Sequence, residues 1–192
     1  MSRVLLLYGT TEGQTATVAE RMADVLREAG HAPTLVHARH LPEGFTLDAY
    51  DAVVVGASVH AGRHQEYVAS FVREHAGALN AVPSAFFSVS LTAAGGDAES
   101  WAAARETLAE FLADTGFEPD ATAVVPGALR YSEYGVLKRF LMKRVVGSAG
   151  GDTDTSRDYE YTDWDEVEGF AREFASRVGS GDAGATPETG EE

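Results

Sequence analysis

The chain has 192 residues, no cysteine and 44% hydrophobic residues, and its 30 acidic against 15 basic side chains give a formal net charge of −15. This length suits one domain, and the lack of cysteine excludes disulfides, thiolate metal sites and a cysteine nucleophile. The acidity disfavours general binding to nucleic acid, and no apolar run approaches the ~18 residues that a membrane span needs.

Strand-like and helix-like segments alternate along the chain. Residues 3–8 and 51–57 are continuous apolar runs, as expected of strands buried on both faces. The expected strands are 3–8, 32–37, 51–57, 83–90 and 121–126, and the expected helices are 14–29, 66–79, 99–115 and 163–178, the last capped by Thr162. This alternation predicts an α/β fold, with a five-stranded parallel sheet between two layers of helices and ligands at the carboxyl ends of the strands.

A polar loop joins the first strand to the first helix. Its residues 9–15 read Gly-Thr-Thr-Glu-Gly-Gln-Thr. The amides and positive dipole of a helix N-terminus bind phosphate without a lysine, and glycine lets the backbone approach closely. The loop matches neither the nucleoside triphosphatase nor the dinucleotide pattern, so it favours a single terminal phosphate. The alternative is a threonine-rich helix cap without a ligand.

Two more loops leave the same sheet edge, at 56–62 and 88–96. Both are small, polar and rich in glycine, and such loops can surround a flat heteroaromatic ring and bond to its edge. His60 lies either beside that ring or in solvent. The other histidines show no metal-ligand spacing, so we predict no metal.

An insertion separates the fifth strand from the last helix. About 35 residues lie between them, far more than the ~12–15 of ordinary loops. Segment 136–146 alternates apolar and basic residues at helical spacing, which is typical either of a helix on an anionic membrane or of a solvated helix packed on the sheet. Residues 179–192 are acidic and lack large apolar side chains, so we expect a disordered tail there and one domain over 1–178.

The loops and the insertion resemble a known family. The 8–15 and 54–64 stretches and the strand alternation resemble flavodoxins, which bind FMN. The whole pattern is more similar to the flavodoxin-like, menaquinone-dependent protoporphyrinogen IX dehydrogenases, through 82–91, 126–134, 150–155 and 161–173. The resemblance spans residues 3 to about 178, and its 126–173 part is specific because simple flavodoxins lack the insertion. It implies a flavodoxin-like sandwich with strand order 2-1-3-4-5 and an insertion at 130–160.

The resemblance also implies the site residues. The first loop would hold the FMN phosphate, and the second and third would hold its ring and ribityl chain. The implied cofactor-binding residues are Thr10, Thr11, Glu12, Gly13, Gln14, Thr15, Ser58, Val59, His60, Ala61, Gly62, Ser88, Ser90 and Leu91. The insertion would be the substrate or quinone region, with Arg130, Tyr131 and Tyr134 as candidates, although the tyrosines would equally serve to anchor the loop. No catalytic acid or base is assigned.

The function favoured by this resemblance is an FMN-dependent oxidoreductase that dehydrogenates protoporphyrinogen IX and passes electrons to a quinone, menaquinone in this family. The rival functions are an electron-carrying flavodoxin, a quinone reductase with another donor, and a flavin-free interaction module. A carrier would need no insertion, and the intact first loop disfavours the module.

The N-terminus lacks a signal-peptide pattern, so we expect a cytoplasmic protein, with 136–146 as a peripheral contact to the inner face of the cell membrane. Only two of the bases, Lys138 and Lys143, are lysines. An acidic, lysine-poor surface is what a high-salt cytoplasm favours, because excess charge keeps proteins soluble there. The alternative is an ordinary acidic protein.

Overall fold

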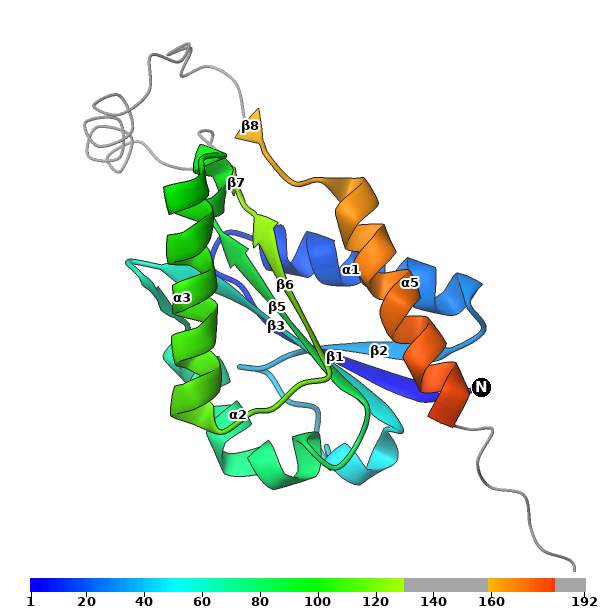
Figure 1. The fold of residues 1–192 in the computed structure, drawn as a ribbon. Helices are drawn as coiled ribbons and strands as arrows, with labels where there is room; N and C mark the ends of the chain where they lie inside the picture. The colour runs from blue at the N-terminus through cyan, green and yellow to red at the C-terminus, as the bar shows by residue number, and fades with distance from the viewer. Residues whose placement is uncertain (130–158, 182–192) are drawn as a thin grey trace, which may run out of the picture.

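The computed structural model describes residues 1–129 and 159–181. A parallel sheet forms the centre of this part (Figure 1), and its strands are β1 (Arg3–Gly9), β2 (Ala32–His37), β3 (Ala52–His60), β5 (Ser84–Ser90) and β6 (Ala121–Pro126). They lie in the order β2-β1-β3-β5-β6. The predicted α/β class and the predicted order of five parallel strands are therefore confirmed. A short strand, β4 (Arg63–His64), pairs antiparallel with the end of β3 and was not predicted.

Helices cover both faces of the sheet. Figure 1 shows α1 (Gln14–Glu28) beside α5 (Trp164–Gly181) on one face, and α2 (Glu66–Leu79) beside α3 (Ala98–Thr115) on the other. Two short 3₁₀ turns, η1 (Leu47–Ala49) and η2 (Ala93–Gly95), lie in the connections. The four helices differ from the predicted ones by no more than a few residues at their ends.

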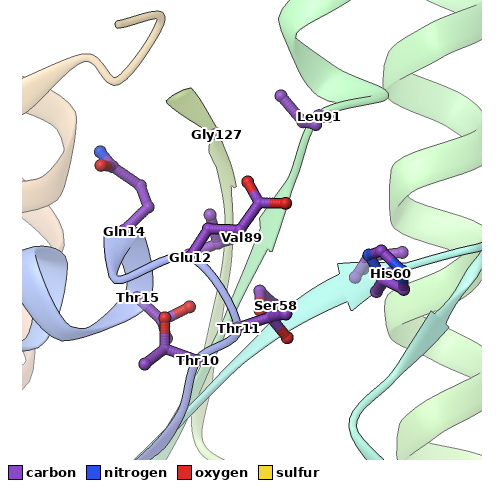
Figure 2. Close-up of a pocket in the computed structure, with 11 residues that line it drawn as sticks. Thr10, Thr11, Glu12, Gln14, Thr15, Ser58, His60, Val89, Leu91 and Gly127 are labelled. Atoms are coloured by element: carbon purple, nitrogen blue, oxygen red, sulfur yellow. The ribbon is translucent and has the colours of Figure 1, made fainter. Parts of the chain in front are cut away.

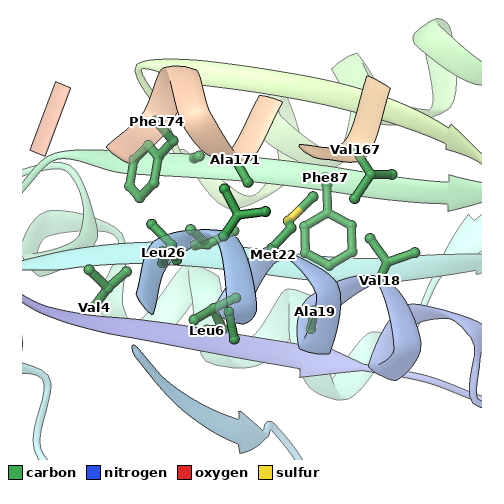
Figure 3. Packing of buried hydrophobic residues seen from close by; sticks show 14 of the residues in the cluster. Val4, Leu6, Val18, Ala19, Met22, Leu26, Phe87, Val167, Ala171 and Phe174 are labelled. Carbon is green, nitrogen blue, oxygen red and sulfur yellow. The ribbon is translucent and has the colours of Figure 1, made fainter. Parts of the chain in front are cut away.

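Alternate residues of each central strand pack on opposite faces, as the pleat of a strand requires. Val4 and Leu6 of β1 pack with Met22 of α1 and Phe174 of α5 in the core shown in Figure 3. Leu5 and Leu7 belong to the second core, with residues of α2 and α3. Two buried faces explain why these strands read as unbroken apolar runs.

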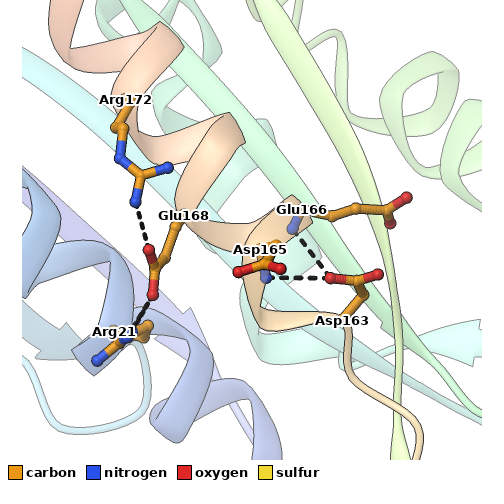
Figure 4. Close-up of polar contacts among 6 residues, drawn as sticks. All are labelled: Arg21, Asp163, Asp165, Glu166, Glu168 and Arg172. Atoms are coloured by element: carbon orange, nitrogen blue, oxygen red, sulfur yellow. Dashed lines mark hydrogen bonds and ion pairs between the residues drawn. The ribbon is translucent and has the colours of Figure 1, made fainter.

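The N-terminus of α5 corrects one prediction. The cap is Asp163, whose Oδ1 accepts the backbone N–H groups of Asp165 at 3.0 Å and Glu166 at 3.1 Å (Figure 4). Thr162, predicted as the cap, is buried and bonds elsewhere. Further along α5, Glu168 pairs with both Arg21 of α1 and Arg172. The Arg21–Glu168 pair joins α5 to α1, while the Arg172–Glu168 pair lies within α5.

A second, two-stranded sheet stands where the insertion was predicted to begin and end. β7 (Ala128–Leu129) and β8 (Tyr159–Glu160) pair antiparallel, with Ala128 opposite Glu160 and Leu129 opposite Tyr159. The residues that flank segment 130–158 are thus side by side. Arg130, Tyr131, Tyr134, segment 136–146 and residues 182–192 lie outside the described residues. Within the described ranges, no helix is long and apolar enough to cross a membrane.

Candidate functional site

A cavity lies at the carboxyl ends of the central strands (Figure 2). Its walls come from the loop after β1 and from the ends of β3, β5 and β6; the lining residues are Thr10, Thr11, Glu12, Gln14, Thr15, Ser58, Val59, His60, Val89, Leu91 and Gly127. This edge of a parallel sheet is where ligands bind in doubly wound folds. Most of the residues implied by the family resemblance are therefore gathered at one place.

The first loop is built around Gly13. This residue is the N-cap of α1 and has a φ of 87°, in the left-handed region that glycine adopts without strain. Its N–H donates to Thr10 Oγ1 at 2.8 Å, which fixes the turn. No side chain caps α1, so first-turn amides such as those of Thr15 and Ala16 keep their capacity to bind an anion.

Thr15 tests whether a phosphate fits this loop. Its side chain is fully buried, and its hydroxyl has no hydrogen-bond partner among the described residues. A buried hydroxyl without a partner costs about 1–3 kcal/mol, so native structures seldom keep one without a reason. Because the residue lines the cavity at a helix N-terminus, a phosphate oxygen is the partner that this arrangement accepts. The residues present therefore fit a phosphate-bearing cofactor.

Gln65 connects the first two loops and was not predicted. Its side-chain oxygen accepts the Ser58 N–H at 3.1 Å, and its amide nitrogen donates to Ser58 Oγ and, at 3.3 Å, to Thr11 Oγ1. Gln65 stands directly before α2, where a polar residue is ordinarily expected to cap the helix, yet its side chain makes no cap bond. Its actual partners are distant in sequence, so the sequence carried no signal for this role.

The two predicted serines of β5 have hydrogen-bond partners within the protein. The hydroxyl of Ser88 is hydrogen-bonded to His64 Nε2 at 2.8 Å, and Ser90 Oγ accepts the Thr92 N–H at 3.2 Å. Both serines are buried and neither lines the cavity. Val89, which was not predicted, lies between them and lines the cavity, because alternate residues of a strand face opposite sides.

Three other predicted residues, Gly13, Ala61 and Gly62, are not among the residues that line the cavity. Ala61 and Gly62 form the exposed turn between β3 and β4, with φ of 50° and 78°. Gly13 contributes its backbone conformation. Gly127 is a further wall residue that was not predicted. His60 is exposed at the edge of the cavity, and its place beside a ring stays a prediction.

Two buried hydrogen bonds link the cavity to the residues on either side of the β7–β8 pair. Gln14 Nε2 donates to Thr162 Oγ1 at 2.8 Å, and Thr162 Oγ1 donates to the Pro126 carbonyl at 2.9 Å. Gln14 lines the cavity, while Pro126 and Thr162 stand just before β7 and just after β8. The first loop is therefore fixed relative to Pro126 and Thr162, on either side of the β7–β8 pair.

Two further features of the site are the protonation of His64 and the arrangement of possible metal ligands. Burial lowers the pKa of His64 to about 4, so this histidine is neutral at physiological pH and serves as a hydrogen-bonding partner of Ser88. Across residues 1–129 and 159–181, no three acidic or histidine side chains gather as a metal-binding group.

Comparison with known proteins identifies the chain's relatives. The flavodoxin domain model matches residues 5–156. Protoporphyrinogen IX dehydrogenase (quinone) of Escherichia coli (strain K12) is 37% identical over 173 residues, which cover 90% of this chain and 94% of that protein. The protein of the same name from Leishmania major is 33% identical over 174 residues, which cover 91% of this chain and 75% of that protein. A short-chain flavodoxin associated with a bacterial microcompartment superposes with a TM-score of 0.58 at 14% identity. The superposition covers 94% of this chain and 99% of the flavodoxin chain.

The fold and the cavity at the carboxyl edge of the sheet define a flavodoxin-type protein, a class that binds flavin. Within that class, the chain belongs to the family of the protoporphyrinogen IX dehydrogenases (quinone), as nearly full-length identity to its members shows.

Proposed function

We propose that the chain is an FMN-dependent oxidoreductase that dehydrogenates protoporphyrinogen IX and transfers the electrons to a quinone such as menaquinone. The observation that carries the proposal is the position of the insertion. Gly127 lines the cofactor cavity and is followed at once by β7, the strand that precedes segment 130–158 in the chain. A simple electron carrier needs no such segment, whereas an enzyme needs a second partner next to its cofactor.

FMN fits the first loop through its terminal phosphate. The Thr15 hydroxyl and the first-turn amides of α1 would hold that phosphate, and Ser58, Val59 and Leu91 would lie along the ring and ribityl chain. The bound flavin supplies the redox chemistry, while the protein orients it and limits access. Gln65 would keep the first two loops at a fixed separation, because it bonds to Thr11 and Ser58 together.

The insertion separates enzyme from carrier in one experiment. Replacing 132–158 by a short Gly/Ser linker should leave FMN bound and reducible, because the cofactor cavity and the β7–β8 pair remain. Anaerobic oxidation of protoporphyrinogen IX with a menaquinone analogue should be lost, while Arg130→Ala should lower turnover less severely. Absorbance spectra and steady-state rates measure the two properties.

Two outcomes of this experiment would contradict the proposal. Wild-type turnover in the shortened protein would show that the segment is not the substrate region. Loss of FMN would show that the segment belongs to the cofactor site. If the parent protein reduces a quinone with another donor but leaves protoporphyrinogen unoxidised, the quinone reductase alternative replaces the proposed activity.

The cellular location and the outer segments are part of the same proposal. We place the protein in the cytoplasm, with 136–146 in peripheral contact with the inner face of the cell membrane, where a lipid-soluble quinone is found. Residues 1–178 would form the domain and 179–192 an acidic, disordered tail. Co-sedimentation with anionic vesicles, compared between the parent protein and the form with the linker, tests the membrane contact; equal sedimentation of the two would refute it.

A further inference from the structure

A second cavity adjoins the cofactor cavity on the side of α2. Thr10, Thr11 and His60 belong to the walls of both, and the second cavity adds Arg39, Arg63 and Tyr67. The two spaces thus meet at the first loop and at the end of β3. A molecule held in the second cavity would therefore lie next to the bound cofactor.

The arginines of this cavity differ from most others in the described part of the chain. Most have a carboxylate partner; these are Arg3, Arg21, Arg27, Arg73, Arg172 and Arg177. Arg39, Arg63 and Arg105 have none there, and two of these three line the same cavity. Since acids outnumber bases by 30 to 15 in the chain, two unpaired arginines in one cavity are not expected from composition alone.

Arg39 is held in place by aromatic contacts. Its guanidinium carbon lies 4.3 Å from the centre of the Tyr67 ring, which leaves the N–H groups at the guanidinium edge available to a ligand. The Tyr67 hydroxyl donates to the Thr10 carbonyl at 3.4 Å, which joins this stack to the first loop. His37 stacks on Tyr67 with ring centres 5.8 Å apart and accepts the Arg39 backbone N–H at Nδ1.

Little negative charge opposes the two arginines. Glu66 is the one acidic residue among the described residues of this cavity wall, and it pairs with Arg73 at 3.7 Å. The pKa of His37 is lowered by burial first and then by the positive charges of His40 and Arg39. The cavity therefore favours an anion, and guanidinium groups bind carboxylates in bidentate pairs.

We propose that this second cavity is a carboxylate subsite of the substrate, in which Arg39 and Arg63 pair with the two propionates of the tetrapyrrole. The inference rests on the proposed function and specifies how the substrate is recognised. The subsite would hold the polar edge of a flat, apolar macrocycle beside the cofactor cavity. The cofactor's own phosphate is the other anion within reach of the shared Thr10 and Thr11, and the experiment separates the two.

The test compares Arg39→Gln, Arg63→Gln and the double variant with the parent holoprotein. The control is Arg105→Gln, since Arg105 also lacks a carboxylate partner in the described ranges but lies over Trp101 on α3, outside this cavity. Anaerobic kinetics are measured with protoporphyrinogen IX and with its dimethyl ester, and FMN affinity by fluorescence titration. Binding of protoporphyrin IX and of its dimethyl ester is measured separately by fluorescence quenching.

In the double variant, KM for the diacid and the dissociation constant of protoporphyrin IX should rise at least tenfold. The kcat and FMN affinity should change less than about twofold, a difference well below the ~1.4 kcal/mol of a tenfold change. The dimethyl esters should bind the parent as weakly as the diacids bind the double variant, and the control should match the parent.

Unchanged diacid affinity in the double variant would overturn the proposal, and so would equal affinity of the parent for diacid and ester. Weaker FMN binding with unchanged diacid affinity would assign the arginines to the cofactor phosphate instead. If the parent binds the diacid through these arginines yet does not oxidise protoporphyrinogen, the subsite stands and the proposed function fails.

Discussion

The hydroxyl of Thr15 is the single atom that most directly indicates a bound ligand. It is buried, lacks a partner in the described part of the chain, and lies at the N-terminus of α1. Thr15→Val keeps the shape of the side chain and removes the hydroxyl. FMN affinity should fall at least tenfold, or ~1.4 kcal/mol, whereas the cofactor-free protein should become more stable by about 1 kcal/mol, because an unsatisfied buried group is gone.

Fluorescence titration and urea unfolding of the cofactor-free protein measure these two opposite effects. The control is Thr107→Val, whose hydroxyl donates to Ala103 on the exposed side of α3. Equal FMN affinity in Thr15→Val and the parent would remove this hydroxyl from the cofactor site.

His64 makes stability depend on pH. Its ring packs against Phe86 and Phe111, and burial lowers its pKa from 6.5 to about 4. Between these two pH values His64 is protonated in the unfolded chain and neutral in the folded chain. Its contribution to the stability of the fold is therefore present above pH 6.5 and is lost as the pH falls toward 4. The full loss is roughly 3 kcal/mol.

His64→Gln removes this titration and retains an amide that can bond to Ser88. The free energy of unfolding should therefore drop by roughly 3 kcal/mol less between pH 7 and pH 4 in the variant than in the parent. Urea unfolding at several pH values measures the difference. Parallel pH profiles of parent and variant would contradict a low pKa for His64.

Some site residues could be predicted from sequence and others could not. The first loop stands between an apolar run and a helix, so its position and chemistry follow from local pattern. On β5 both faces are buried, so nothing in the sequence tells which alternate residues face the cavity, and Val89 in its wall could not be predicted. Arg39 and Gln65 act through contacts distant in sequence, which no local pattern reveals.

At the scale of elements, the long strands and helices were predictable because hydrophobic periodicity extends over several turns or residues. The two-residue strands β4, β7 and β8 are too short to show any period. The cap of α5 was misassigned by one residue, because Thr162 and Asp163 are both good cap residues and only the tertiary bonds of Thr162 decide between them.

Those bonds make Thr162 a structural link between three elements. Thr162→Val removes the acceptor of Gln14 Nε2 and the donor to the Pro126 carbonyl, both in a buried setting. The free energy of unfolding should fall by about 2 kcal/mol. In a double-mutant cycle with Gln14→Leu, the two changes should be non-additive because they share one bond.

Urea unfolding provides these values, and Thr122→Val, on the exposed side of β6, is the control. Additive effects of the Thr162 and Gln14 changes would mean that their bond contributes nothing to stability.

At the scale of the whole molecule, added salt has two opposite effects on the stability of the fold. It weakens ion pairs, which stabilise the fold, and it screens the repulsion of the net charge, which destabilises the fold. The described ion pairs are exposed at one or both side chains, and such pairs contribute only ~0–1 kcal/mol each, which salt weakens. A net charge of −15 produces repulsion across the entire surface, which salt also screens. Because acids outnumber bases by 30 to 15, we expect the repulsion to be the larger effect, so the melting temperature should rise from dilute buffer to molar KCl.

Differential scanning calorimetry in KCl, with the cofactor saturating, measures this change. A melting temperature that stays constant or falls would show that the acidic surface is not an adaptation to high salt.

The pairing of β7 with β8 has a consequence for how such a chain can evolve. Because Leu129 and Tyr159 face each other, residues gained or lost between them leave β6 and α5 where they are. Lengthening a loop whose ends are already joined costs little, ~0.6 kcal/mol for each doubling of a flexible one. Natural selection can thus change the sequence and length of the segment between these residues while the flavin-holding sheet is inherited intact. A protein engineer can likewise graft a foreign segment between β7 and β8.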